Sequence, residues 1–115
     1  MINATQAAIA VGHDFEVGEI LAGRWGYEQT NIDYYQIVRV TPSTVMVQQL
    51  NKRSTATGDM TSKSQPIPGA FADGSKPFRK TPRRRSRGGE CYIGLTHGTA
   101  SRTDPSIWTN ETHYA

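Results

Sequence analysis

Residues 32–50, with the sequence IDYYQIVRVTPSTVMVQQL, decide the fold of this chain. Polar and apolar side chains alternate through residues 32–40, and a period of two is that of a β-strand. The segment Thr41-Pro42-Ser43 then separates this run from a second β-rich run at residues 44–50. Because Pro and Ser favour turns, the pattern predicts an antiparallel hairpin. The expected first strand places Tyr34, Gln36, Val38 and Val40 on one face and Tyr35, Ile37 and Arg39 on the other.

The sequence on either side of the hairpin extends it into a small sheet. Glycines at positions 18, 23 and 26 predict bends or bulges in a curved sheet, and residues 91–95 (CYIGL) predict a strand that returns to the core. Residues 1–14 are expected to form a short helix or a frayed end. Residues 51–90 are rich in Ser, Thr, Pro and basic side chains and poor in aliphatic ones. They predict a long loop excursion that is either functional or mobile.

The expected fold is therefore mainly β, with little helix. We expect a small antiparallel sheet or a partly open SH3-like barrel, carrying the long loop excursion after the hairpin. A chain of 115 residues is expected to form a single domain, 1–115, and an apolar content of 36% allows only a modest core. A homo-oligomer would bury more apolar surface, so the expected partners include a second copy of the chain.

The start of the sequence and the cysteine content predict a cytoplasmic protein with no membrane contact. The sequence MINATQAAIAVGHD has no basic segment and no long apolar run, which argues against a signal peptide or a membrane span. Cys91 is the single cysteine, so no internal disulfide is expected.

No motif of a known enzyme chemistry is present in the sequence. A GxGxxG run, a P-loop, an HExxH motif and paired zinc-binding cysteines are all missing. Cys91 with His97 would suggest a thiol nucleophile and its base, although a lone Cys that opens an apolar strand is more often a small buried hydrophobe. The three histidines lack metal-ligand spacing. We therefore expect a protein that is not an enzyme and that uses no cofactor or metal.

The positive charge is concentrated in one segment. Residues 76–87, KPFRKTPRRRSR, hold seven of the thirteen basic residues and no acid; the other six face ten acids, so the rest of the chain carries −4. Arginine grips phosphate with a planar fork, and an aromatic ring beside it can stack on a base. The alternative is a solvated loop without a specific partner. The candidate phosphate or nucleic-acid contacts are Arg83, Arg84, Arg85 and Arg87, and the candidate stacking and phosphate group is Phe78, Arg79 and Lys80.

Residues 25–31, WGYEQTN, form the second candidate site. Two aromatic rings stand beside three directional hydrogen-bonding groups, which suits the reading of base edges and ribose hydroxyls. The alternative is a turn that satisfies its own polar groups. From Ile32 onward, a core strand explains the tyrosines without any functional role. The candidate ligand-binding residues of this segment are Trp25, Tyr27, Glu28, Gln29 and Asn31.

Two blocks of the sequence carry a resemblance to known proteins. The run VGEILAGRWGYEQTNIDYYQIVRVTPSTVMVQQL resembles small bacteriophage, prophage and plasmid proteins with a WGY(E/D)QTN(I/V)D(F/Y)YQV motif, most of which have no assigned activity. The run TGDMTSKSQPIPGAFADGSKPFRK is similar to their middle block, a PxPGxF element followed by basic residues, and the final Tyr114-Ala115 resembles their ending. The resemblance covers most of the chain from Val17 onward.

Phage proteins of this size are often counter-defence factors. The size and the aromatic and arginine content are similar to those of the Thoeris anti-defence sponges, small β-rich oligomers that sequester a cyclic ADP-ribose signal. The resemblance implies a non-catalytic, immune-evasion protein that binds a nucleotide-derived signal of the cyclic ADP-ribose or cyclic oligonucleotide class. It implies Trp25 as a stacking wall. Two alternatives stay open: a nucleic-acid-binding module that uses residues 76–87, and a protein–protein inhibitor of a host defence enzyme.

Overall fold

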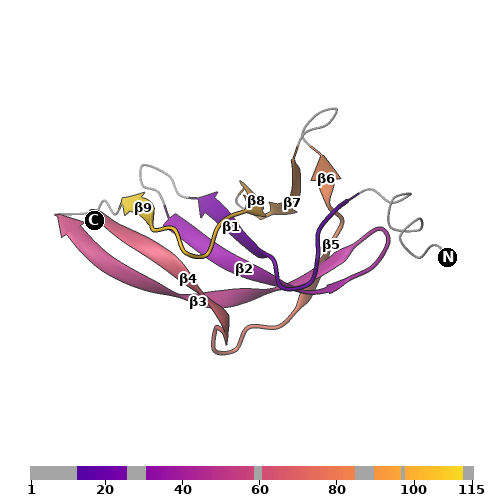
Figure 1. Cartoon of the computed structure of the whole chain (residues 1–115), viewed down its shortest axis with the longest axis horizontal. Coiled ribbons are helices and arrows are strands. Elements are labelled where there is room, and N and C mark those ends of the chain that lie inside the picture. The colour runs from indigo at the N-terminus through magenta and orange to yellow at the C-terminus, as the bar shows by residue number, and fades with distance from the viewer. Residues whose placement is uncertain (1–12, 26–30, 59–60, 85–89, 97, 113–115) are drawn as a thin grey trace.

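The chain forms one antiparallel β-sheet in the computed structural model (Figure 1). Among the described residues there are nine strands and no helix, so the expected mainly β class is confirmed. No helix of the described part is long and apolar enough to cross a membrane. The expected helix or frayed end at residues 1–14 falls almost entirely outside the described residues. The structure describes residues 13–25, 31–58, 61–84, 90–96 and 98–112.

The strand order in the sheet is β6-β7-β8-β1-β2-β3-β4-β9, and β5 pairs with β3 beside the end of β4. Among the described strands, the two ends of this order, β6 and β9, are not paired with each other, so the expected antiparallel sheet is not closed into a barrel. The strands are β1 (Ile20–Trp25), β2 (Asn31–Val40), β3 (Val45–Gly58), β4 (Thr61–Phe71), β5 (Phe78–Lys80), β6 (Arg83–Arg84), β7 (Cys91–Leu95), β8 (Gly98–Arg102) and β9 (Thr109–Thr112).

The predicted hairpin is confirmed as β2 and β3, with Tyr35 opposite Gln49 and Ile37 opposite Val47. A β-bulge after Ile37 inserts Val38 as an extra residue, so that Arg39 pairs with Met46. The prediction that Val40 shares a face with Tyr34 is therefore wrong. Because one inserted residue reverses the alternation that follows it, Val40 packs with Ile37 in the same cluster.

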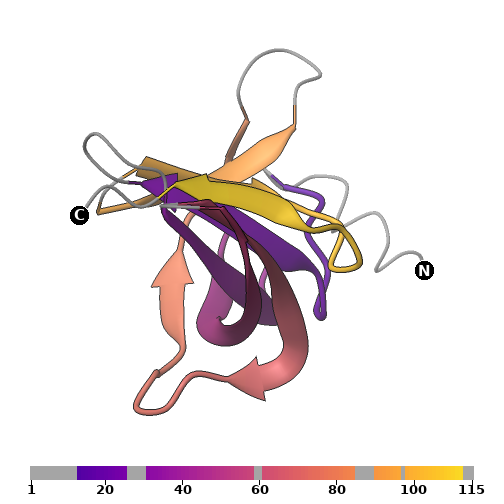
Figure 2. The same cartoon turned by 90° about the vertical axis from the view of Figure 1, so that its left-hand side faces the viewer.

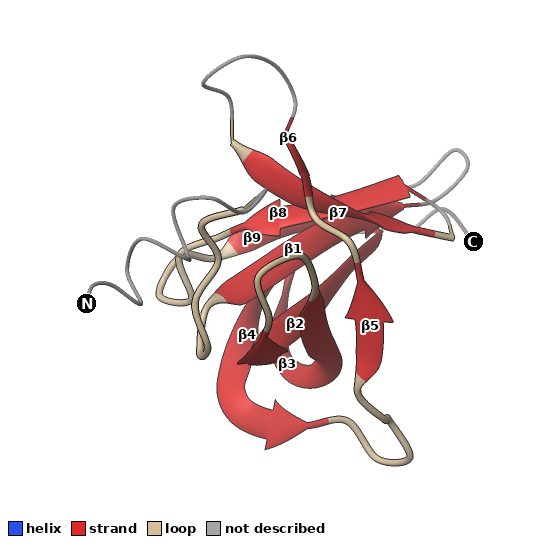
Figure 3. Cartoon of the chain, turned by 90° about the vertical axis from the view of Figure 1, so that its right-hand side faces the viewer, coloured by secondary structure: helices blue, strands red, loops and turns tan. Residues whose placement is uncertain are grey.

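The sheet buries apolar side chains on both faces. We call the face of β1–β3 that carries Leu21, Ile37 and Val47 the front face, and the face that carries Ile32 and Tyr34 the back face. The front-face cluster also holds apolar side chains of β7 and β8, although β7 lies four places from β3 in the sheet order. The sheet must therefore curl so that β7 returns over the front face, and the curl is visible in Figure 2 and Figure 3.

Arg102 of β8 holds the segment before β1 against the front-face core. Its guanidinium lies 4.6 Å from the centroid of the Phe15 ring, and it donates to Asp14 Oδ1 at 2.9 Å and to Glu19 Oε2. The hydrogen bond to Glu19 is the main reason that the pKa of Arg102 lies above its usual value. Phe15 is thereby 4% exposed and closes one side of the core.

Residues 51–71 correct the expected loop excursion. β3 continues to Gly58 and pairs with β4, with Thr55 opposite Lys63, so this part of the 51–90 segment is a long twisted hairpin. The side chains of β3 from Arg53 onward are exposed on both faces, so no apolar alternation marks the strand in the sequence. Pro66 is tolerated because the β3–β4 register shifts between Leu50 and Lys52, beside it.

A buried ion pair ties β9 to the centre of the sheet. The Glu111 carboxylate is 1% exposed, and its Oε1 lies 3.0 Å from Lys52 Nζ. Lys52 Nζ also donates to the Ile32 carbonyl at 2.6 Å, while the Ile32 N–H donates to Glu111 Oε1 at 3.1 Å. The β2–β3 ladder begins only at Tyr34 opposite Leu50. The ion pair therefore satisfies the backbone of Ile32, where the ladder does not reach.

The Glu111 carboxylate predicts a loss of stability in acid. Burial raises its pKa, but hydrogen bonds from Ser64, Lys52 and the Ile32 N–H outweigh burial, so the pKa lies below the ordinary value of 4.5. A lowered folded-state pKa stabilises the fold above the unfolded pKa, and this contribution disappears as the pH falls through the folded value. We expect the free energy of unfolding in urea to fall as the pH decreases below about 5. In Glu111→Gln this fall should be shallower; an unchanged slope would contradict the assignment.

Candidate functional site

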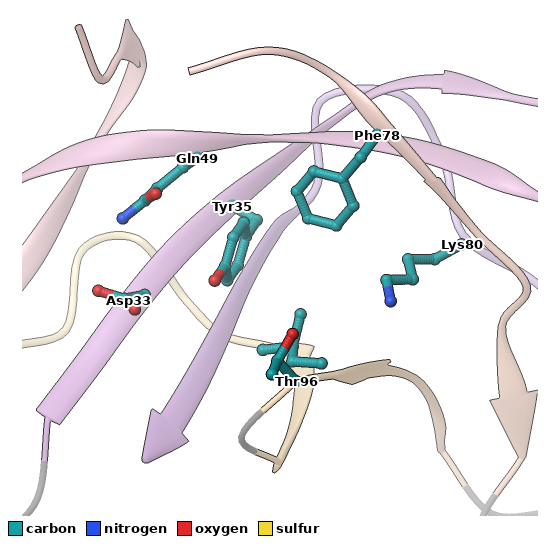
Figure 4. Close-up of a pocket in the computed structure, with 7 residues that line it drawn as sticks. Asp33, Tyr35, Gln49, Phe78, Lys80 and Thr96 are labelled. Atoms are coloured by element: carbon teal, nitrogen blue, oxygen red, sulfur yellow. The ribbon is translucent and has the colours of Figure 1, made fainter. Parts of the chain in front are cut away.

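A groove of about 480 Å³ opens on the front face, between the β2–β3 hairpin, β5 and the end of β7 (Figure 4). Its lining combines two aromatic rings, two charges of opposite sign, an amide, a hydroxyl and one aliphatic side chain. The lining residues are Asp33, Tyr35, Gln49, Phe78, Lys80, Leu95 and Thr96.

Strand pairing places these side chains on one surface. Tyr35 of β2 lies opposite Gln49 of β3, and Asp33 shares their face because it is two residues from Tyr35 on the same strand. β5 then brings Phe78 opposite Val47 and Lys80 opposite Val45. β4 leaves β3 after Leu50, and β5 takes its place along β3 after the turn at residues 72–77. The groove therefore forms because β5 pairs with β3 near the turn of the β2–β3 hairpin, where β4 no longer does.

The two rings meet edge to face at the base of the groove. The centroids of Tyr35 and Phe78 are 5.8 Å apart at an interplanar angle of 89°, and both side chains rest on the front-face core. Lys80 Nζ lies 5.9 Å from the Phe78 centroid, within the range of a cation–π contact. Burial, and then the charge of Asp33, raises the pKa of the Tyr35 hydroxyl, so it stays protonated at neutral pH and can donate.

The charges of the groove lie on opposite sides of the rings. Asp33 and Gln49 lie beyond Tyr35 on one side, and Lys80 lies beyond Phe78 on the other (Figure 4). A ligand with a flat group stacked on one of these two perpendicular rings would therefore meet hydrogen-bond acceptors at one end and a cation at the other. Such a concave, largely preformed site with a few directional polar groups suits a small organic ligand.

The predicted stacking and phosphate group is only partly brought together. Phe78 and Lys80 line the groove, but Arg79 is exposed and paired with Met46, on the face opposite to the groove. The reason is strand alternation, which separates neighbouring side chains on β5. Arg83 and Arg84 are exposed on β6 and do not line the groove. Arg85 and Arg87 lie outside the described residues.

The predicted WGYEQTN site is described only at its ends. Tyr27, Glu28 and Gln29 lie outside the described residues, and the backbone of Trp25 ends β1 opposite Asn31. Asn31 begins β2 on the same face as Asp33, beside the groove. Its Nδ2 is buried without a hydrogen-bond partner within the described part of the chain, which is unusual for a buried polar atom.

Four polar or aromatic groups of the groove are not among the site residues predicted from the sequence: Asp33, Tyr35, Gln49 and Thr96. For Tyr35 the sequence predicts a position in the core strand. A signal was nevertheless present, because Asp33 and Gln49 interrupt the face that also carries Ile37 and Val47. A polar pair inside an otherwise apolar strand face marks either a partner or a site.

The structure describes one member of the Cys91–His97 pair, the cysteine. Cys91 is fully buried in the front-face core, in agreement with the alternative of a small hydrophobe, and His97 lies outside the described part. Among the described residues no three His, Cys, Asp or Glu side chains are grouped for a metal ion.

Comparison of the chain with protein-family models, with curated proteins and with solved structures gives no match. The resemblance to phage proteins stays a prediction, and the chemistry of the groove carries the functional argument.

Proposed function

We propose that this chain is a non-catalytic binding protein that holds a nucleotide-type anion in the front-face groove. In line with its resemblance to phage proteins, sequestration of a nucleotide-derived immune signal is its role. The observation that carries the proposal is the pair of rings, Tyr35 and Phe78, flanked by acceptors on one side and by Lys80 on the other. A base needs an aromatic surface and directional polar groups, and its phosphate needs a cation.

The groove supplies each of these needs from rigid elements. All but one of its lining side chains lie on strands, and the exception, Thr96, directly follows β7. A preformed site loses little conformational freedom when a ligand binds. It can therefore hold a ligand tightly without any covalent chemistry. The exposed Arg83 and Arg84 follow Lys80 closely along the chain and add a positive field that draws anions towards this end.

Lys80→Ala is expected to lower the affinity for the best-binding nucleotide by about tenfold, because a charge-assisted contact to phosphate is lost. Arg79→Ala is the matched control, since it removes an equal charge from the neighbouring position on the opposite face. It should leave the affinity unchanged within about twofold. Titration calorimetry would measure both, with AMP, ADP-ribose, cyclic ADP-ribose and cyclic dinucleotides as ligands.

This comparison decides whether the nucleotide binds in the groove or is attracted only by the charge of the surface. If Arg79→Ala weakens binding as much as Lys80→Ala, the charge acts through the surface field and the groove is not the site. If none of the nucleotides raises the melting temperature and none is released from the purified protein on denaturation, the proposed function is wrong.

A nucleic-acid-binding module is the second candidate, favoured by the exposure of Arg79, Arg83 and Arg84 away from the groove lining. Contacts from these side chains to backbone phosphates would weaken steeply with added salt. An Arg79, Arg83 and Arg84→Ala triple variant that binds an oligonucleotide as well as the parent would exclude this function.

A further inference from the structure

The backbone of β1 leaves room at Gly23 for a side chain that lines the groove. A Cβ added to Gly23 would lie 2.7 Å from Leu95 Cδ1, about 1 Å inside the usual contact distance between carbon atoms. Leu95 ends β7, which lies two places from β1 in the sheet order. The curl of the sheet brings the tip of Leu95 down onto β1, beside the point where Gly23 pairs with Asp33 of β2. This close approach requires a glycine, because any other residue carries a Cβ.

Leu95 is the neighbour that would have to move if position 23 carried a Cβ. The other near neighbours would be the Thr99 carbonyl oxygen at 3.4 Å and Ala100 Cβ at 3.5 Å, both on β8, which is paired with β1. The strand ladder holds these groups in place, whereas the tip of Leu95 is the end of a flexible side chain. Leu95 rests on the front-face core on one side and lines the groove on the other. A Cβ at position 23 would therefore push Leu95 into the groove.

We propose that Gly23 keeps the groove wide by letting Leu95 lie against β1, and that this width limits the size of the base that the groove accepts. The inference rests on the proposed nucleotide function and adds a size limit to its ligand class. Gly23 is not among the lining residues, so it is a positioning residue that acts through Leu95. Thr96, the residue after Leu95, lies across the groove from Phe78 in Figure 4, so Leu95 belongs to the wall that faces the rings. A base that stacks on either ring is therefore limited in size by this wall.

Gly23→Ala is expected to weaken the binding of AMP by about tenfold, because the displaced Leu95 occupies space that the ligand needs. The same loss is expected for every other nucleotide of the set above that the parent protein binds. Gly94→Ala is the matched control: Gly94 precedes Leu95 on β7, and a Cβ added there would meet no atom within 4 Å. It should leave the affinity unchanged within about twofold. Titration calorimetry measures the affinities, and the melting temperature of each variant shows whether its fold is retained.

The double variant Gly23→Ala and Leu95→Ala tests whether the effect passes through Leu95. It removes the displaced side chain, so its affinity for each nucleotide should return to within about threefold of that of Leu95→Ala alone. A loss caused by damage to β1 itself would not be restored by a change on β7.

Leu95→Ala alone tests the size limit and does not depend on the folding of a Gly23 variant. Etheno-AMP has the ribose and phosphate of AMP, but an extra ring is fused to its adenine. The wider groove of Leu95→Ala should raise the affinity for etheno-AMP relative to AMP by about fivefold over the parent protein, because the wall that limits the base is removed.

Three results would overturn the inference and leave the proposed function standing. The first is a Gly23→Ala variant that binds as tightly as the parent protein. The second is a loss in Gly23→Ala that Leu95→Ala does not restore. The third is an unchanged ratio of etheno-AMP to AMP affinity in Leu95→Ala. If the parent protein binds no nucleotide of the set, the proposed function itself is wrong and the inference falls with it.

Discussion

Lys52→Ala is expected to lower the free energy of unfolding by about 2–3 kcal/mol. The variant leaves the Glu111 carboxylate, which is 1% exposed, without its cation, and it leaves the Ile32 carbonyl without its donor. An uncompensated buried charge costs far more than the ion pair itself contributes. Lys52 is partly exposed, so water can approach Glu111 in the variant, and the expected loss stays below that of a fully buried pair. Equilibrium unfolding in urea measures it.

Lys63→Ala is the matched control, because Lys63 lies on β4, opposite Thr55 of the β3–β4 hairpin, with an exposed side chain. It should change the free energy of unfolding by less than about 0.5 kcal/mol. The double variant Lys52→Met and Glu111→Gln removes both charges but keeps an amide oxygen as acceptor for the Ile32 N–H. It should recover part of the loss, since no buried charge is then left without its partner. A Lys52→Ala variant as stable as the Lys63→Ala control would show that Glu111 is satisfied without Lys52.

The sequence predicts those strands in which buried and less buried side chains alternate along the chain. The alternation in residues 32–40, the turn at Thr41-Pro42-Ser43 and the short apolar run Cys91–Leu95 all reappear as strands or as the turn between them. In these runs apolar side chains enter a core at every second position, so the two-residue period of a strand can be recognised from the sequence. The same reasoning could not locate the inserted Val38, because a bulge is fixed by the pairing of two strands and not by one of them.

The far end of the β3–β4 hairpin shows the opposite case. Ser, Thr and basic side chains of residues 53–58 are exposed on both faces, so backbone pairing with β4 and not burial makes them a strand. Their composition alone predicts a loop. β9 then pairs with β4, and the buried Glu111 anchors it; neither contact has a local signature in the sequence.

The chemistry of single residues predicts part of the groove lining, but it does not predict which side chains share one surface. Phe78 and Lys80 were selected for their ring and charge, and both line the groove. Their partners Tyr35 and Asp33 come from a strand more than forty positions earlier, and only the pairing of β5 with β3 brings the two sets together. Arg79 was selected by the same chemistry and lies on the other face, because sequence proximity on a strand does not mean a shared surface.

Phe78→Ala is expected to lower the affinity for the best-binding nucleotide by about 30-fold, the largest loss among the groove variants. Stacking of a base on an aromatic ring contributes about 1–3 kcal/mol, and the Phe78 ring also orients Tyr35 and Lys80 through contacts at 5.8 and 5.9 Å. Titration calorimetry against the same set of nucleotides measures the loss. Because Phe78 also packs against the front-face core, the melting temperature of each variant has to be measured beside its affinity.

Phe78→Leu separates stacking from packing. Leucine keeps most of the apolar contact with the front-face core but has no flat π surface, so affinity should fall nearly as far as in Phe78→Ala while the melting temperature falls less. Tyr35→Phe keeps the second ring and loses only its hydroxyl, so its affinity should fall by less than about tenfold. If Phe78→Leu binds as tightly as the parent protein, no base stacks on this ring. Only the Tyr35 ring and the polar groups of the groove would then remain to hold a ligand.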